Sequence, residues 1–125
     1  KELSWENAYT KEEIRPIIED ARAMGAQIIP MFNHLGHAAQ SRVSCGRHVV
    51  LDQNPRKACL FEPDGWTWCI SKPEVRALLK SIREELMELC GEGTYFHLGC
   101  DEAYSFAECD LCEAEKRQAG YYMGR

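Results

Sequence analysis

Residues 95–104, with the sequence YFHLGCDEAY, combine a short apolar run with two adjacent carboxylates. The aromatic and branched side chains predict a buried strand that ends at Gly99. Asp101 and Glu102 follow directly after it. Neighbouring side chains of a strand point to opposite faces, so these two carboxylates reach one ligand only if the backbone bends. Because Gly99 makes such a bend easy, we expect the strand to open into a functional site.

The adjacent carboxylates suit acid–base chemistry on a glycosidic bond. One carboxyl group of such a pair can be held protonated while its neighbour stays ionised. The alternative is an Asp-Glu pair that caps the next helix or faces water. This stretch alone leaves both interpretations open.

The length and charge of the chain limit its fold and its partners. With 125 residues and 45% hydrophobic residues, the chain can bury one core, so we expect one globular domain or part of one over 1–125. The net charge of -5 and the lack of a Lys/Arg cluster argue against nucleic-acid or anionic-membrane partners. No long apolar run or signal peptide is recognisable, which favours a cytoplasmic protein without a membrane span. The chain begins at Lys1 rather than Met, which suggests a segment of a longer polypeptide.

Three helices and a second strand are predicted around the carboxylate segment. The capping box at Thr10–Glu13 starts an amphipathic helix that ends at Gly25. The continuous apolar run at 27–33 is typical of a parallel strand that is buried on both faces. Residues 71–90 form a second helical pattern, with a serine cap and a proline in the first turn, and 111–118 form a third.

The order of these elements predicts an α/β fold. A helix followed by strand, helix, strand and helix is a βαβ unit with a leading helix, and its two strands should be parallel. Ligands bind such sheets at the carboxyl ends of the strands. Asn33, His34 and His37 follow the first strand, whereas Asp101 and Glu102 follow the second, so we expect these side chains to converge.

The long connection between His34 and Ile70 contains two tryptophans. Trp66 and Trp68 follow the turn sequence at 63–65, and aromatic faces pack well against sugar rings. They could therefore form an aromatic wall for a ring-shaped ligand. The alternative is that they fill the small core of the connection itself.

The seven cysteines are an odd count and favour reduced thiols over a disulfide framework. Cys109 and Cys112 have the C-x-x-C spacing of a zinc knuckle or a redox pair. A complete zinc site needs two more ligands, however, and the sequence has no second C-x-x-C. We therefore favour incidental thiols at a helix start, and expect no metal and no cofactor.

Several of these segments, in this order, resemble glycoside hydrolase family 20. They are the capped helix after Tyr9, the strand with Pro30 that leads to Gly36-His37, the CISKPEV sequence at 69–75 and the HLGCDE sequence at 97–102. The resemblance runs from about Tyr9 to Tyr104. It implies β-N-acetylhexosaminidases built on a (β/α)₈ TIM barrel, of which this chain would be the βαβ segment around strands 3 and 4. Cys100 stands where the family commonly has glycine, which is similar to the hexosaminidase D-like branch.

The resemblance also implies roles for individual residues in a retaining, exo-acting enzyme that removes terminal β-linked GlcNAc or GalNAc. Glu102 corresponds to the general acid/base. Asp101 corresponds to the residue that orients the 2-acetamido group of the substrate, whose carbonyl oxygen attacks the anomeric carbon in place of an enzyme nucleophile.

Other residues would support this pair. His37 corresponds to a histidine that hydrogen-bonds the acid; its alternative is a solvated loop histidine. Asn33 replaces a common aspartate and can still hydrogen-bond to Asp101. His97 lies inside the strand, where we expect a buried, hydrogen-bonded structural role.

Two rival hypotheses belong to other classes. One is a metal-dependent barrel hydrolase of amidohydrolase type, with His34, His37, His97 and Asp101 as ligands. The other is a non-catalytic, sugar-binding half-barrel that associates with itself to cover exposed strand edges. The second hypothesis arises because a complete barrel needs about 250 residues.

Overall fold

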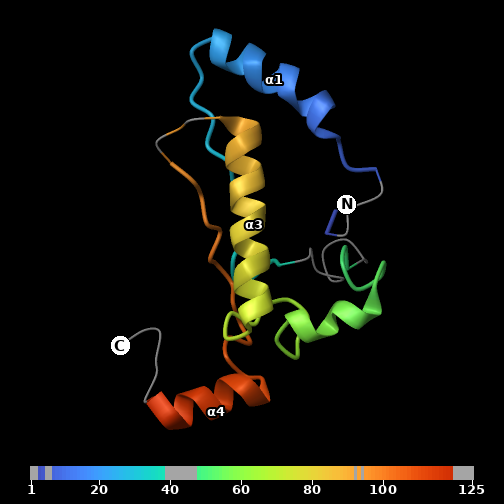
Figure 1. Ribbon diagram of the computed structural model, residues 1–125, viewed down its shortest axis with the longest axis vertical. Coiled ribbons are helices and arrows are strands. Elements are labelled where there is room, and N and C mark those ends of the chain that lie inside the picture. The colour runs from blue at the N-terminus through green and yellow to red at the C-terminus, as the bar shows by residue number, and fades with distance from the viewer. Residues whose placement is uncertain (1–2, 5–6, 39–47, 92, 94, 120–125) are drawn as a thin grey trace.

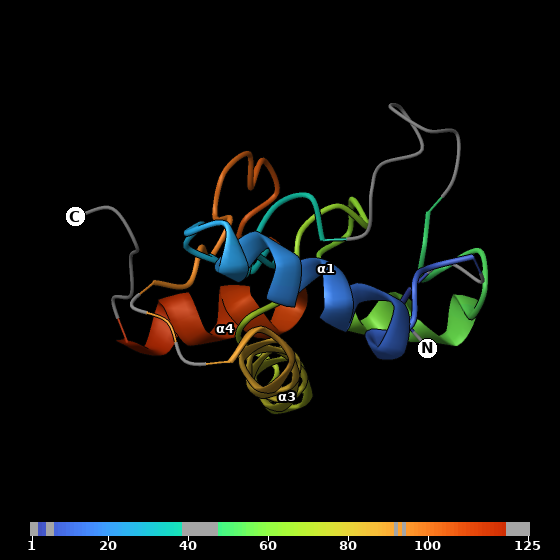
Figure 2. The same cartoon turned by 90° about the horizontal axis from the view of Figure 1, so that it is seen from above.

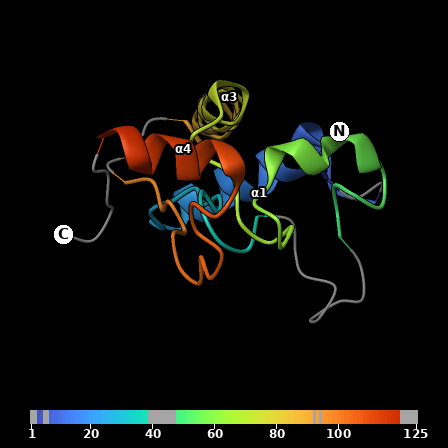
Figure 3. The same ribbon diagram turned by 90° about the horizontal axis from the view of Figure 1, so that it is seen from below.

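The computed structural model describes residues 3–4, 7–38, 48–91, 93 and 95–119 (Figure 1). Its helices are α1 (Lys11–Ala23), the 3₁₀ helix η1 (Pro55–Leu60), α3 (Pro73–Cys90) and α4 (Asp110–Ala119). The long helix α3 forms the axis, with α1 near its C-terminal end and α4 near its N-terminal end (Figure 1). Views along α3 show that α1 and α4 cross it rather than run beside it (Figures 2 and 3). None of the helices described is long and apolar enough to cross a membrane.

Helix α1 begins with the predicted capping box. The Thr10 hydroxyl accepts a hydrogen bond from the Glu13 N–H at 3.3 Å, and the Glu13 carboxylate accepts one from the Thr10 N–H at 2.7 Å. Lys11 joins α1 to Glu85 of α3 through an ion pair of 3.0 Å. No residue of α1 is buried, and Ile17 is 59% exposed. The described residues therefore cover the predicted apolar face only in part, with Ile14 and Ile18 half-buried.

Helix α3 occupies the range that its apolar stripe predicts, but its cap differs. The N-cap is Lys72, which makes no side-chain cap hydrogen bond, so the predicted serine cap at Ser71 is wrong. Pro73 is the first helical residue, and its fixed φ starts the helix without a capping side chain. Val75 and Leu79 enter the main core, whose buried members are Ala38, Val49, Val50, Leu60, Phe61, Trp68, Val75 and Leu79.

The two predicted strand segments lie side by side and run parallel. Met31 and His97 form a parallel bridge, the Phe32 N–H donates to the His97 carbonyl at 3.2 Å, and the His97 N–H donates to the Pro30 carbonyl at 2.9 Å. The described residues contain only isolated bridges and no longer strand. The parallel order is therefore present, and the complete βαβ unit stays a prediction.

The expected burial of the first strand on both faces is wrong for this structure. Ile29 and Met31 are 49% and 52% exposed, and Tyr95 and Leu98 of the second segment are 63% and 48% exposed. A barrel strand is buried because neighbours pair with both of its edges and helices cover its outer face. Among the described residues, the backbone of each segment pairs with the other segment alone.

The long connection is ordered by a hairpin at residues 61–68. Phe61 and Trp68 form an antiparallel bridge, and the Asp64 carboxylate accepts the Trp66 N–H at 2.9 Å in the turn between them. Trp68 is 1% exposed and stacks on Phe61 with ring centroids 4.6 Å apart. Of the two tryptophans, Trp68 therefore fills the core, and only Trp66 lies half-buried at the tip.

Candidate functional site

The ends of the two parallel segments are held together by His34. Its buried ring donates from Nδ1 to the carbonyl oxygens of Phe32 and Leu98, at 2.6 and 2.9 Å. The His34 N–H donates to the Leu98 and Gly99 carbonyls at 2.9 and 3.1 Å. Gly99 has φ 55°, and a Cβ atom there would overlap the Asn33 side chain. The bend that the sequence predicts at this glycine is therefore present.

Beyond this point His37 meets both carboxylates. Its Nε2 atom lies 2.9 Å from Glu102 Oε2 and 3.5 Å from Asp101 Oδ2. Gly36 makes the approach possible, because a Cβ atom at this residue would overlap the carbonyl oxygens of Asp101 and Glu102. The predicted convergence of the two segment ends thus occurs through His37, and both carboxylates remain open to solvent.

Trp66 closes one side of this group. Its ring centroid lies 4.3 Å from that of His37, with an interplanar angle of 54°. The Trp66 indole N–H donates to the Glu102 carbonyl at 2.7 Å. The hairpin tip therefore places an aromatic face beside the histidine and the carboxylates.

Asn33 and His97 differ from their expected positions. The Asn33 amide donates to the His37 carbonyl at 3.3 Å, so it supports the histidine loop rather than Asp101. Its Oδ1 atom is buried and has no hydrogen-bond partner among the described residues. The His97 side chain is exposed, so its predicted buried structural role is wrong; its backbone pairs the two segments instead.

Tyr104 is a site residue that sequence reasoning missed. A hydrogen bond to the Glu102 carboxylate, together with the nearby negative charges, raises the pKa of the Tyr104 hydroxyl. The Tyr104 N–H also donates to the Glu102 carbonyl at 3.0 Å. Glu102 begins this turn and has a φ of 49°. The only signal in the sequence was a tyrosine two residues after Glu102.

The ligands of the metal-hydrolase hypothesis do not form a cluster. The Nδ1 atom of His34 hydrogen-bonds to two backbone carbonyls, and the His34 ring packs between Phe32 and Phe96. Within the described parts of the chain, the group of side chains that could hold a metal ion is a different one and contains neither Asp101 nor any of the three histidines of that hypothesis. The structure therefore gives no support to a metal centre built from those four residues.

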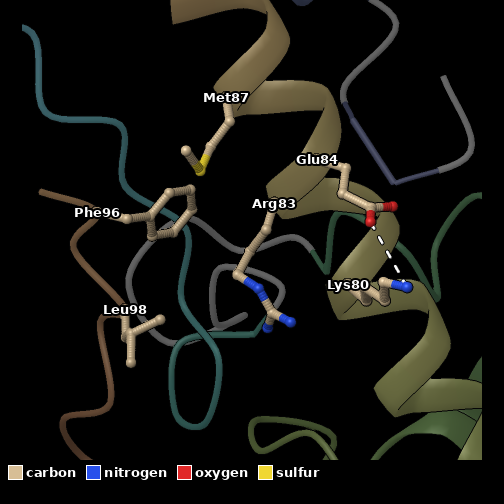
Figure 4. A pocket seen from close by; sticks show the side chains of 6 residues that line it. All are labelled: Lys80, Arg83, Glu84, Met87, Phe96 and Leu98. Atoms are coloured by element: carbon tan, nitrogen blue, oxygen red, sulfur yellow. Dashed lines mark ion pairs between the residues drawn. The ribbon is translucent and has the colours of Figure 1, made fainter. Parts of the chain in front are cut away.

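A separate hollow of about 470 Å³ lies between α3 and the second strand segment (Figure 4). Phe96 and Leu98 face Met87 and Arg83 across it, and the ion pair of Lys80 with Glu84 lies at its edge, 3.6 Å long. None of its lining residues belongs to the carboxylate site. We regard it as incomplete packing between helix and strand.

The parallel segments, the two carboxylates beside His37 and the adjacent tryptophan have the arrangement that the resemblance to a glycoside hydrolase implies. A family model described as "Glycosyl hydrolase family 20, catalytic domain" matches residues 1–123. The chain belongs to this family, whose catalytic domain is a TIM barrel.

Three curated relatives agree with this assignment. The chain is 25% identical to "Beta-hexosaminidase" of Porphyromonas gingivalis over 90% of its length, and 28% identical to "Chitooligosaccharidolytic beta-N-acetylglucosaminidase" of Bombyx mori over 75%. It is 30% identical to "Beta-hexosaminidase" of Akkermansia muciniphila over 91%. These matches span 14%, 16% and 24% of the relatives, so the chain corresponds to a minor part of each. No solved structure matches the chain.

Proposed function

We propose that the protein is a retaining exo-β-N-acetylhexosaminidase that hydrolyses terminal β-linked GlcNAc or GalNAc with assistance from the substrate's own 2-acetamido group. The observation that carries this proposal is the contact of 2.9 Å between His37 Nε2 and Glu102 Oε2, with Asp101 beside it. The names of the relatives support the same activity.

Glu102 is the general acid/base in this proposal. As a carboxylic acid it protonates the glycosidic oxygen, and as a carboxylate it later takes a proton from the attacking water. His37 and the Tyr104 hydroxyl both contact its side chain and fix the direction of proton transfer. Trp66 holds the backbone of the same residue through its indole N–H.

Asp101 acts on the acetamido group. Its carboxylate accepts a hydrogen bond from the amide N–H, which aims the carbonyl oxygen at the anomeric carbon and balances the positive charge of the cyclic oxazolinium intermediate. Water then opens this intermediate from the face that the aglycone left, so the product retains the β configuration. No carboxylate of the protein forms a covalent bond to the sugar.

The test is the hydrolysis of aryl β-glycosides of GlcNAc and GalNAc by the full-length protein and by Glu102→Gln and Asp101→Asn. Loss of the general acid should lower kcat/KM by about 10²-fold to 10⁴-fold on poor leaving groups and much less on an acidic nitrophenol, which departs without protonation. The loss caused by Asp101→Asn should not depend on the leaving group. Glu88→Gln, on the exposed side of α3, is the matched control.

Two outcomes would contradict this proposal. Turnover by Glu102→Gln equal to that of the unmodified protein would remove Glu102 from the chemistry. A full-length protein that binds a thiazoline mimic of the intermediate but turns over neither glycoside would favour the non-catalytic sugar-binding hypothesis.

A further inference from the structure

A second cluster of reactive side chains lies apart from the carboxylate site. The ligand atoms of Glu62, Cys69, Cys109 and Cys112 all lie within 4.8 Å of one another. We propose that these four residues form a structural zinc site. The proposal does not depend on the hexosaminidase activity, because none of the four residues belongs to the site of that chemistry.

The spacing of the three thiols fits a shared metal ion. Cys69 Sγ lies 3.3 Å from Cys109 Sγ and 3.6 Å from Cys112 Sγ, and the last two are 3.4 Å apart. A tetrahedral zinc ion with Zn–S bonds of about 2.3 Å holds its sulfur atoms about 3.8 Å apart. A disulfide would need about 2.05 Å between two of them and would leave the third thiol unpaired.

Glu62 completes the ligand set with one of its two oxygens. Its Oε2 atom accepts the N–H groups of Glu108 and Cys109, at 3.0 and 2.8 Å, and so caps the start of α4. Its Oε1 atom faces the thiols and lies 3.4 Å from Cys112 Sγ. Oxygen and sulfur ligands of one tetrahedral zinc ion are separated by about 3.5 Å. The cap therefore holds the free oxygen where a metal ligand belongs.

Burial supports a bound cation. Glu62 is 3% exposed, Cys69 is fully buried and Cys112 is 2% exposed. A carboxylate in such a place is costly unless a positive charge compensates it. None of the ion pairs found in the described part of the chain involves Glu62. A divalent cation would supply that charge and stabilise the thiolates.

The donor atoms select zinc among the common metal ions. Three sulfur ligands exclude Ca²⁺ and Mg²⁺, which prefer oxygen, and favour a thiophilic ion with tetrahedral geometry. Four protein ligands leave no open position for water, which is the hallmark of a structural rather than a catalytic zinc site. Glu62 lies in the hairpin of Trp66 and Cys69 directly follows it, whereas Cys109 precedes α4 and Cys112 lies in its first turn. The ion would join the hairpin to the segment that follows Glu102.

The first measurement is the metal content of the full-length protein, purified without chelators and after exchange with Co²⁺. We expect about one zinc ion per chain and, with Co²⁺, the intense visible absorption of a tetrahedral thiolate site. Cys112→Ser should lose both signals. Cys59→Ser, which removes an exposed thiol outside the cluster, should keep both. Glu62→Gln retains a carbonyl oxygen for the helix cap and should bind the metal more weakly.

Alkylation of the unmodified protein gives a result that does not depend on whether a variant folds. With zinc present, Cys69, Cys109 and Cys112 should be protected while Cys59 and Cys100 react; a chelator should remove the protection of Cys109, the partly exposed member. Metal-free protein that takes up no Zn²⁺ or Co²⁺ would overturn the proposal. So would a disulfide between two of the three cysteines, or equal metal uptake by Cys112→Ser.

Discussion

His37 and Glu102 both adopt left-handed backbone conformations, with φ 53° and 49°. Such conformations are unfavourable for residues with a Cβ atom and cost about 1–3 kcal/mol each unless the surroundings impose them. Here the two strained residues contact each other at 2.9 Å. The loop that carries His37 lies against the Glu102 backbone at Gly36. The contact between His37 and Glu102 therefore depends on residue 36 having no side chain.

Gly36→Ala should therefore separate His37 from the carboxylates. The new Cβ atom would overlap backbone oxygens that cannot rotate away, so the loop must shift. We expect kcat of the full-length protein for the proposed reaction to fall by about 10-fold to 100-fold through misplacement of Glu102, the proposed acid, and the stability to fall by about 1–3 kcal/mol. Aryl glycoside kinetics and urea unfolding measure these two effects.

Gly93→Ala is the matched control for this substitution. A Cβ atom there would meet only the Ile28 carbonyl at an ordinary distance of 3.4 Å. Its kcat for the proposed reaction should equal that of the unmodified protein. If Gly36→Ala also kept full kcat, the close approach of the two loops would have no role in catalysis.

At the scale of elements, local sequence signals located the helices well. The capping box placed the start of α1, and the apolar stripe placed α3 to within two residues. The C-x-x-C segment was also predicted at a helix start, where α4 begins. Its partners Glu62 and Cys69 could not be predicted, because they lie 40 to 50 residues earlier and are positioned by a hairpin whose packing no short-range pattern encodes. The position of Trp66 over His37 depends on the same hairpin.

The capping box gives a prediction for α1. This helix buries no residue, so its stability should depend on local interactions. Thr10→Ala removes the acceptor for the Glu13 N–H and should cost about 1 kcal/mol, which lowers amide protection in α1 about fivefold. Hydrogen exchange followed by mass spectrometry would detect this, and Thr10→Ser, which keeps a hydroxyl, should stay close to the unmodified protein.

The capping box at Thr10 and Glu13 should also make the stability of α1 depend on pH. Hydrogen bonds with the Thr10 backbone and side chain lower the pKa of the Glu13 carboxyl group from its usual value. A carboxyl group with a lowered pKa stabilises the folded state above its unfolded pKa, and that contribution is lost as the pH falls through the lowered value. Unmodified protein and Glu13→Gln should therefore differ in α1 stability at neutral pH and converge in acid. A constant difference across this range would show that the ionised carboxylate does not contribute.

At the scale of the whole molecule, the described residues leave apolar groups of the paired segments in water. Ile29, Met31, Tyr95 and Leu98 are each about half exposed or more. In a family 20 barrel these segments would have further strands at their edges and helices over their outer face. The sequence pattern predicted strands buried by such neighbours, whereas the described residues show only a single parallel bridge between the two segments. The mismatch between predicted and observed burial thus follows from the minor share of the relatives that this chain spans.

We expect the 125-residue chain, when produced alone, to associate with itself through these segments. Unpaired strand edges with apolar side chains recruit other chains, because pairing satisfies the backbone and buries the side chains. Light scattering should show a mass that rises with concentration, and Ile29→Lys together with Tyr95→Lys should restore the monomer. Ile17→Lys, at an equally exposed position on α1, should leave association unchanged because a helix offers no free edge. A chain that stays monomeric at high concentration would instead mean that the two segments are stable without barrel neighbours.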